Sequence, residues 1–124
     1  MHNSRPKFLD LLLIQLPLPG VISILHRISG AVLFLALPFA LWMLQYSLRS
    51  IETYTALVRL LGHPLSKAVL LVVLWALAHH FCAGLRFLAI DLGAGVKLRR
   101  ARTSAKWVLV VSFVLTAAAG AMLW

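Results

Sequence analysis

The chain has 124 residues, of which 62% are hydrophobic and only 12% charged, whereas a soluble domain usually carries about 25% charged residues. These few polar side chains cannot cover the surface of a small water-soluble globule, which argues against that class. Twelve Lys and Arg against three Asp and Glu give a formal charge of +9. By itself this charge would suit nucleic acid, anionic lipid or an acidic partner.

Three uncharged stretches are long enough to cross a membrane, and in chain order they cover residues 29–48, 68–85 and 107–124. A helix rises about 1.5 Å per residue, so about 20 apolar residues span a hydrocarbon core of roughly 30 Å. The sequence predicts an all-α integral membrane protein and a single membrane-anchor domain over residues 1–124. Within it we expect a cytoplasmic segment at 1–20 and transmembrane helices over about 21–49, 66–90 and 105–124.

The basic residues predict how these spans are oriented. The interval between the second and third spans holds Lys97, Arg99, Arg100, Arg102 and Lys106. The interval between the first and second spans and its edges hold only Arg49, Arg59 and Lys67. The positive-inside rule then places the N-terminus in the cytoplasm and the C-terminus outside. Orientation and attraction to anionic lipid of the bilayer therefore explain the charge, with no nucleic-acid partner.

The first group of polar residues lies in the segment SILHRISG, residues 23–30. A helix over 21–49 would run roughly 43 Å, longer than the hydrocarbon, so its first turns are expected at the cytoplasmic interface. Ser23 and Arg27 share one helix face and could hydrogen-bond a carbonyl or carboxylate there, while His26 points about 100° away. The alternative is that Arg27 reaches lipid headgroups and His26 is an ordinary interfacial residue.

The second group is HHFCAGLR, residues 79–86. Two adjacent helical histidines point about 100° apart, so at most one of them is a strong candidate for a metal ligand. His80 shares a stripe with Ala76, Ala83 and Gly84, where small side chains would let a flat macrocycle approach with imidazole as its axial ligand. The alternative is that the small residues serve helix packing and both histidines bond neighbouring helices. The single Cys82 excludes the Cys-x-x-Cys-His attachment of c-type haem.

One histidine is an incomplete set of axial ligands for a six-coordinate haem. No second histidine is expected at the depth of His80, because His26 is expected at the interface and His2 and His63 outside the membrane. The second ligand would therefore come from another chain, which predicts a hetero-oligomer.

Three segments, RPKFLDL, LPLPGVISILHRISG and ALAHHFCAGLRFLAIDLG, occur in this order on a three-span chain. They resemble the cytochrome b membrane-anchor subunit of bacterial succinate dehydrogenase, over nearly the whole length. The most specific signals are SILHRISG and His-x3-Gly-Leu-Arg followed by x4-Asp-x-Gly, residues 80–93. The resemblance implies a multi-pass subunit of the bacterial cytoplasmic membrane, without a complete active site of its own.

The resemblance also implies roles for individual residues. His80 would be the axial ligand of the haem b iron, with the opposing histidine on a second membrane-anchor subunit. Ser23 and Arg27 would line a ubiquinone pocket beside the iron-sulfur subunit. His26 and Arg27 would lie near the haem propionates, and Asp91 would have a structural or pocket-supporting role.

Two positions depart from the family pattern. Phe87 stands where the family often has a second histidine, and His79 stands where some members have a tyrosine. The first departure removes any propionate contact made there. The second leaves the role of His79 open.

The predicted function is to anchor the flavoprotein and iron-sulfur subunits of succinate dehydrogenase and to form part of the site where electrons from succinate reduce ubiquinone. Two alternatives stay open from the residues alone. One is a related anchor that binds quinone without haem, in which His80 would be a packing residue. The other is a small three-helix membrane protein with no redox role.

Overall fold

The computed structural model describes residues 16–124, and within this range the chain forms four helices. They are α1 (Leu18–Ser47), α2 (Ile51–Leu61), α3 (Pro64–Asp91) and α4 (Leu98–Leu123). Helices α1, α3 and α4 are each long and apolar enough to cross a membrane. The predicted all-α fold with three membrane spans is confirmed, while most of the expected N-terminal segment, residues 1–15, lies outside the described residues.

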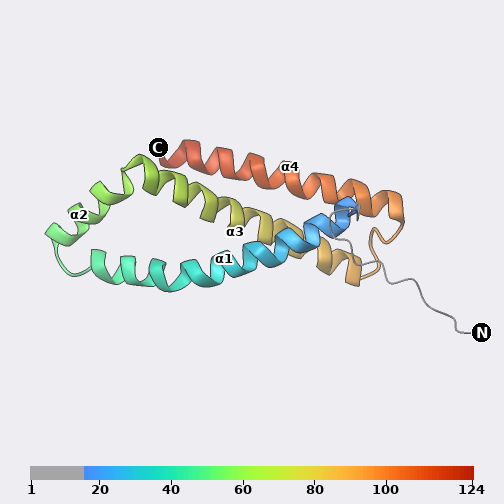
Figure 1. Cartoon of the computed structure of the whole chain (residues 1–124), viewed down its shortest axis with the longest axis horizontal. Helices are drawn as coiled ribbons and strands as arrows, with labels where there is room; N and C mark the ends of the chain where they lie inside the picture. Colours follow the sequence, from blue (N-terminus) through green and yellow to red (C-terminus); the bar gives the residue numbers. More distant parts are fainter. Residues whose placement is uncertain (1–15) are drawn as a thin grey trace, which may run out of the picture.

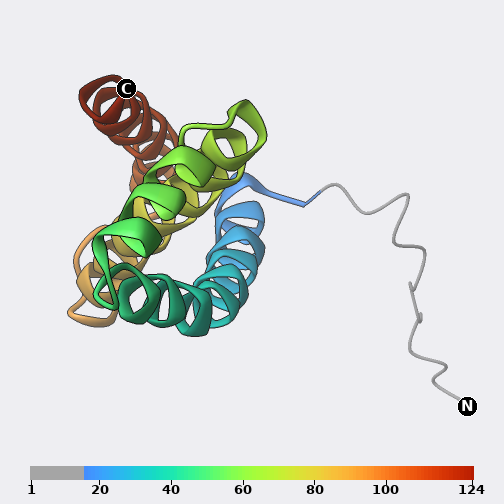
Figure 2. The same cartoon turned by 90° about the vertical axis from the view of Figure 1, so that its left-hand side faces the viewer.

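The three long helices run roughly along one axis, with α3 packed against both α1 and α4 (Figure 1). Seen along that axis, α1 and α4 lie on different sides of α3 (Figure 2). The α3–α4 turn lies at the end where α1 begins, and α2 lies at the opposite end with the C-terminus (Figure 1). The cation of Lys67, 5.6 Å from the centre of the Trp124 ring, joins the start of α3 to the end of α4.

Proline sets the start of two of the helices. Pro17 precedes α1 in an extended conformation, and a further proline lies in the first turn. Pro64 opens α3, where its missing N–H costs nothing, and the His63 ring accepts a hydrogen bond of 3.2 Å from the Leu65 N–H. α1 continues through Pro38.

The two connecting segments contain more helix than the sequence analysis expects. α2 lies in the interval between the first two spans, where Ser50 and Thr53 form a capping box at its start. α4 begins at Leu98 rather than near residue 105, so the basic residues of the second interval lie on its first turns. Arg, Ala and Lys are good helix formers, and a helix has no reason to end at the membrane boundary.

Little of the apolar surface is buried within the chain. A small core joins Ile22 of α1, Ala83 of α3, and Ala105 and Val108 of α4. Large apolar side chains elsewhere are exposed, such as Phe34 at 77%. This surface suits contact with lipid, because exposing so much apolar area to water is unfavourable.

Candidate functional site

The first half of α1 crosses the second half of α3 (Figure 1). Two histidines, one from each helix, meet at this crossing. The rings of His26 and His80 are stacked, with their centroids 4.1 Å apart and their planes 8° from parallel. The edge of Phe87 contacts His26, at 5.2 Å between ring centroids. The crossing therefore places His26 level with His80 along the helices, which corrects the expectation that no second histidine lies at the depth of His80.

Two glycines allow the helices to approach this closely. A Cβ on Gly30 of α1 would lie 3.0 Å from the His80 Cε1, so the ring would have to move by a few tenths of an ångström to accept it. A Cβ on Gly84 of α3 would lie 3.6 Å from the His26 Nε2. Each helix thus carries a His-x3-Gly pair, and the histidine of each helix packs over the glycine of the other.

The ring of His80 is held by two oxygen atoms of α1. Its Nδ1 lies 3.1 Å from the backbone oxygen of His26 and 3.3 Å from the Ser29 hydroxyl. A carbonyl oxygen can only accept, so the Nδ1 of His80 is the donor. A neutral imidazole with its proton on Nδ1 carries its free lone pair on Nε2.

His79 has a different environment from His80. It is fully buried, at 0% exposure, and its ring stacks on Trp75 at 5.1 Å between centroids. Neither of its ring nitrogens has a hydrogen-bond partner within the described part of the chain. His80 is half-buried and lies closer to the surface of the chain.

The small residues of α3 do not form the open stripe that the sequence analysis expects beside His80. Ala76 and Ala83 are buried inside this chain, at 1% and 0% exposure, on the same face as His79. The ring of His26 occupies the space over Gly84. These residues serve helix packing, because a macrocycle cannot reach side chains that α1 and α4 already cover.

Ser23 and Arg27 lie on α1 close to the histidine pair. Ser23 is half-buried and Arg27 is exposed on the isolated chain. Asp91 is exposed at the end of α3. The sequence thus brings Ser23, His26, Arg27 and His80 to one end of the α1–α3 pair, with Arg27 at its surface.

A buried arginine joins α3 to α4 near the same end of the molecule. Arg86 is 8% exposed, and its Nε donates to the Ser104 hydroxyl at 2.9 Å. Its Nη2 donates to the backbone oxygen of Ala101 at 3.1 Å. This contact could not be predicted from the sequence, because it depends on how the two helices pack.

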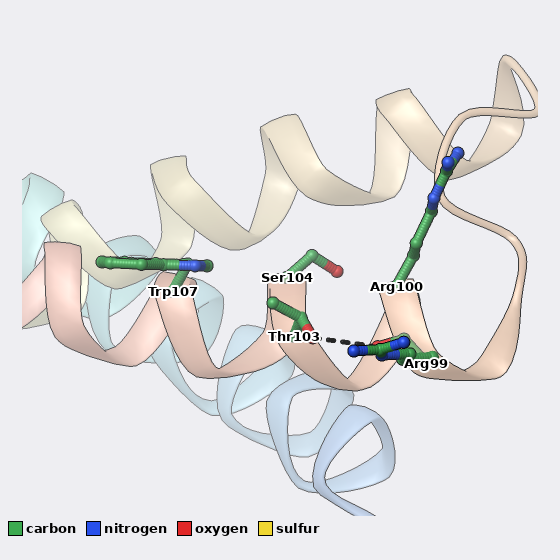
Figure 3. Close-up of a pocket in the computed structure, with 5 residues that line it drawn as sticks. All are labelled: Arg99, Arg100, Thr103, Ser104 and Trp107. Carbon is green, nitrogen blue, oxygen red and sulfur yellow. Dashed lines mark hydrogen bonds between the residues drawn. The ribbon is translucent and has the colours of Figure 1, made fainter.

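Ser104 also borders a shallow pocket of about 420 Å³ on the first turns of α4. Figure 3 shows its lining residues, all from this helix: Arg99, Arg100, Thr103, Ser104 and Trp107. Thr103 donates to the backbone oxygen of Arg99 at 3.0 Å. The pocket combines basic side chains with an exposed tryptophan, a residue common where lipid meets water.

These features define a multi-pass membrane protein with a histidine pair enclosed between two of its spans. Residues 1–119 match the family model of the succinate dehydrogenase/fumarate reductase transmembrane subunit, and the chain belongs to this family.

Curated relatives agree with this assignment over most of their length. The chain is 39% identical to the succinate dehydrogenase cytochrome b556 subunit of Coxiella burnetii, over 100% of both proteins. It is 30% identical to the protein of the same name in Rickettsia felis, over 94% of this chain and 90% of the relative. The Paracoccus denitrificans protein of that name is also 30% identical, over 92% of this chain and 88% of the relative.

Proposed function

We propose that this chain is the haem b anchor of a succinate dehydrogenase and that His80 provides the axial ligand of the iron on its side. The observation that carries the proposal is the ring of His80. Its Nδ1 is held by the backbone oxygen of His26, which directs the free lone pair to Nε2, the nitrogen left to bind a metal. His80 and the backbone oxygen that orients it therefore fit the binding of a haem iron.

The same geometry favours His80 over His79. A haem shared between two chains must be reached from the surface of each, and His79 is fully covered by its own chain. His26 cannot serve as the opposing ligand, because its ring is stacked on the face of the His80 ring. Two stacked rings could not bind one iron from two sides, so an opposing histidine would come from a second anchor subunit.

When bound, haem b supplies one-electron redox chemistry, whose potential depends on the axial ligands and on burial. In this proposal the chain orients the ligand and excludes water. Arg27, exposed beside the histidine pair, would provide a positive charge for the propionates, and His26 would be a second residue near them.

The quinone part of the proposal rests on Ser23 and Arg27, which the isolated chain leaves partly open. A hydroxyl and a guanidinium can donate hydrogen bonds to the oxygens of ubiquinone. An iron-sulfur subunit, itself bound to the flavoprotein subunit, would close this pocket from the cytoplasmic side. The C-terminus would then lie outside the bacterial cytoplasmic membrane, following the distribution of basic residues.

A reduced-minus-oxidised spectrum of the purified complex tests the haem assignment. His80→Ala should abolish or shift the b-type bands, because the iron loses the imidazole that the His26 backbone oxygen orients. His79→Ala is the matched control, since it changes the adjacent residue on the same helix, and it should keep the bands.

Loss of the bands in His79→Ala with retention in His80→Ala would contradict the ligand assignment. A wild-type complex with no b-type bands would instead support an anchor that binds quinone without haem. Wild-type quinone reductase activity in both His80→Ala and Arg27→Ala membranes would favour a protein with no redox role.

A further inference from the structure

We infer that Ser29, together with the backbone oxygen of His26, positions the imidazole of His80 and sets how strongly its Nε2 donates electrons. Ser29 is therefore a positioning residue for the metal ligand. The inference rests on the proposed role of His80 and adds a function for a residue outside the expected ligand and quinone sets.

The hydrogen bonds around Ser29 are satisfied by one consistent assignment of donors and acceptors. Its hydroxyl donates to the backbone oxygen of His26 at 2.9 Å, so its proton is engaged. Its oxygen remains free to accept from the Nδ1–H of His80 at 3.3 Å, beside the shorter contact of this N–H with the His26 backbone oxygen at 3.1 Å. The Nδ1–H is thus shared between two acceptors that are linked to each other.

Because Ser29 is buried, water cannot take over its hydrogen bonds. Ser29 is 1% exposed, so water does not replace its oxygen when the hydroxyl is removed. The next residue, Gly30, has no side chain, and a Cβ there would press on the His80 ring at 3.0 Å and displace it slightly. The ring is therefore confined by the backbone of α1 on one side and by its two acceptors at Nδ1.

A hydrogen bond donated by the second ring nitrogen raises the basicity of a ligating histidine. A more basic ligand stabilises the oxidised metal relative to the reduced metal. Removal of one acceptor should therefore make His80 a weaker donor and raise the midpoint potential of the haem. This effect raises the midpoint potential, whereas a loss of packing could change the potential in either direction.

The test is a potentiometric titration of haem b in the purified complex, with haem content measured in parallel. Ser29→Ala should keep haem at the wild-type content and raise its midpoint potential. Ser29→Thr restores an acceptor oxygen and should return the potential toward the wild-type value. Ser112→Ala is the matched control, because Ser112 is also fully buried and its hydroxyl bonds the residue three positions earlier at 2.9 Å, on α4 and apart from His80.

An unchanged or lower potential in Ser29→Ala would overturn the inference. An equal rise in Ser112→Ala would also overturn it, because general packing would then explain the shift. Haem retained in His80→Ala with unchanged b-type bands would instead refute the proposed ligand. Loss of haem in His80→Ala together with a wild-type potential in Ser29→Ala would refute the positioning role alone.

Discussion

Three histidines at or near the α1–α3 crossing have three different environments. His79 is sealed inside the chain, His80 is held at Nδ1 by oxygen atoms, and His26 stacks on His80 while its own backbone oxygen accepts from it. Only His80 combines an oriented ring with a position near the surface of the chain. Local surroundings, rather than residue type, separate the candidate ligand from its neighbours.

At this scale we predict that Ser23→Ala and Arg27→Ala impair quinone reduction more than electron transfer from succinate to an artificial soluble acceptor. Each change removes a hydrogen-bond donor to the quinone and leaves the dehydrogenase partners unchanged. We expect a tenfold loss or more for Arg27→Ala, since a charged hydrogen bond contributes about 1.5–3 kcal/mol. Paired assays with the two acceptors measure the difference.

Arg59→Ala is the control for the arginine change, because Arg59 lies on α2 at the other end of the molecule. Equal loss of both activities in the Ser23 and Arg27 variants would indicate failed assembly. That result would contradict a quinone role for these residues.

At the scale of the elements, buried polar contacts and small residues hold the three long helices together. Arg86 ties α3 to the first turns of α4, and Ala83 and Ala105 bring the two helices close. In lipid, helices associate through close packing and hydrogen bonds rather than through the hydrophobic effect. The Arg86 contacts therefore set the position of α4 against α3.

We predict that Ser104→Ala destabilises the complex by about 1–3 kcal/mol, because it leaves the buried Nε of Arg86 without its acceptor. Thermal unfolding of the solubilised complex measures this effect. Thr103→Ala is the matched control, since the adjacent hydroxyl bonds only its own helix and is exposed. Equal midpoints of thermal unfolding for the two variants would show that the stability conferred by Arg86 does not depend on its hydrogen bond to Ser104.

At the scale of the whole molecule, the chain is an incomplete structure by itself. Its core is small, and large apolar side chains cover most of the outer faces of α1, α3 and α4. Part of that surface meets lipid, and the family assignment means that other subunits of a membrane complex meet the rest. The half-buried His80 is consistent with a site completed by another chain.

The distribution of basic residues predicts the orientation of the molecule. Alkaline phosphatase fused after Trp124 should be active, because this enzyme needs disulfides that form only outside the cytoplasm. The matched fusion after Gly95, in the α3–α4 turn, should be inactive. The opposite pattern of activities would show that the three spans run in the other direction.

The sequence by itself determined the class of protein, the three spans and the membership of the family. Hydropathy, charge distribution and the segments around His26 and His80 are local in the chain, so they can be read without a fold. The helix α2 could also have been predicted from the sequence, since Ser50 and Thr53 are recognisable capping residues.

Only the tertiary structure decided which histidine is covered, that His26 stacks on His80 and what Arg86 contacts. These properties depend on the rotation of each helix about its axis and on the crossing of α1 with α3. Helical periodicity shows which residues share a face, but it does not show which neighbour covers that face. The small residues near His80 illustrate the difference, because Ala76 and Ala83 turned out to pack inside the chain.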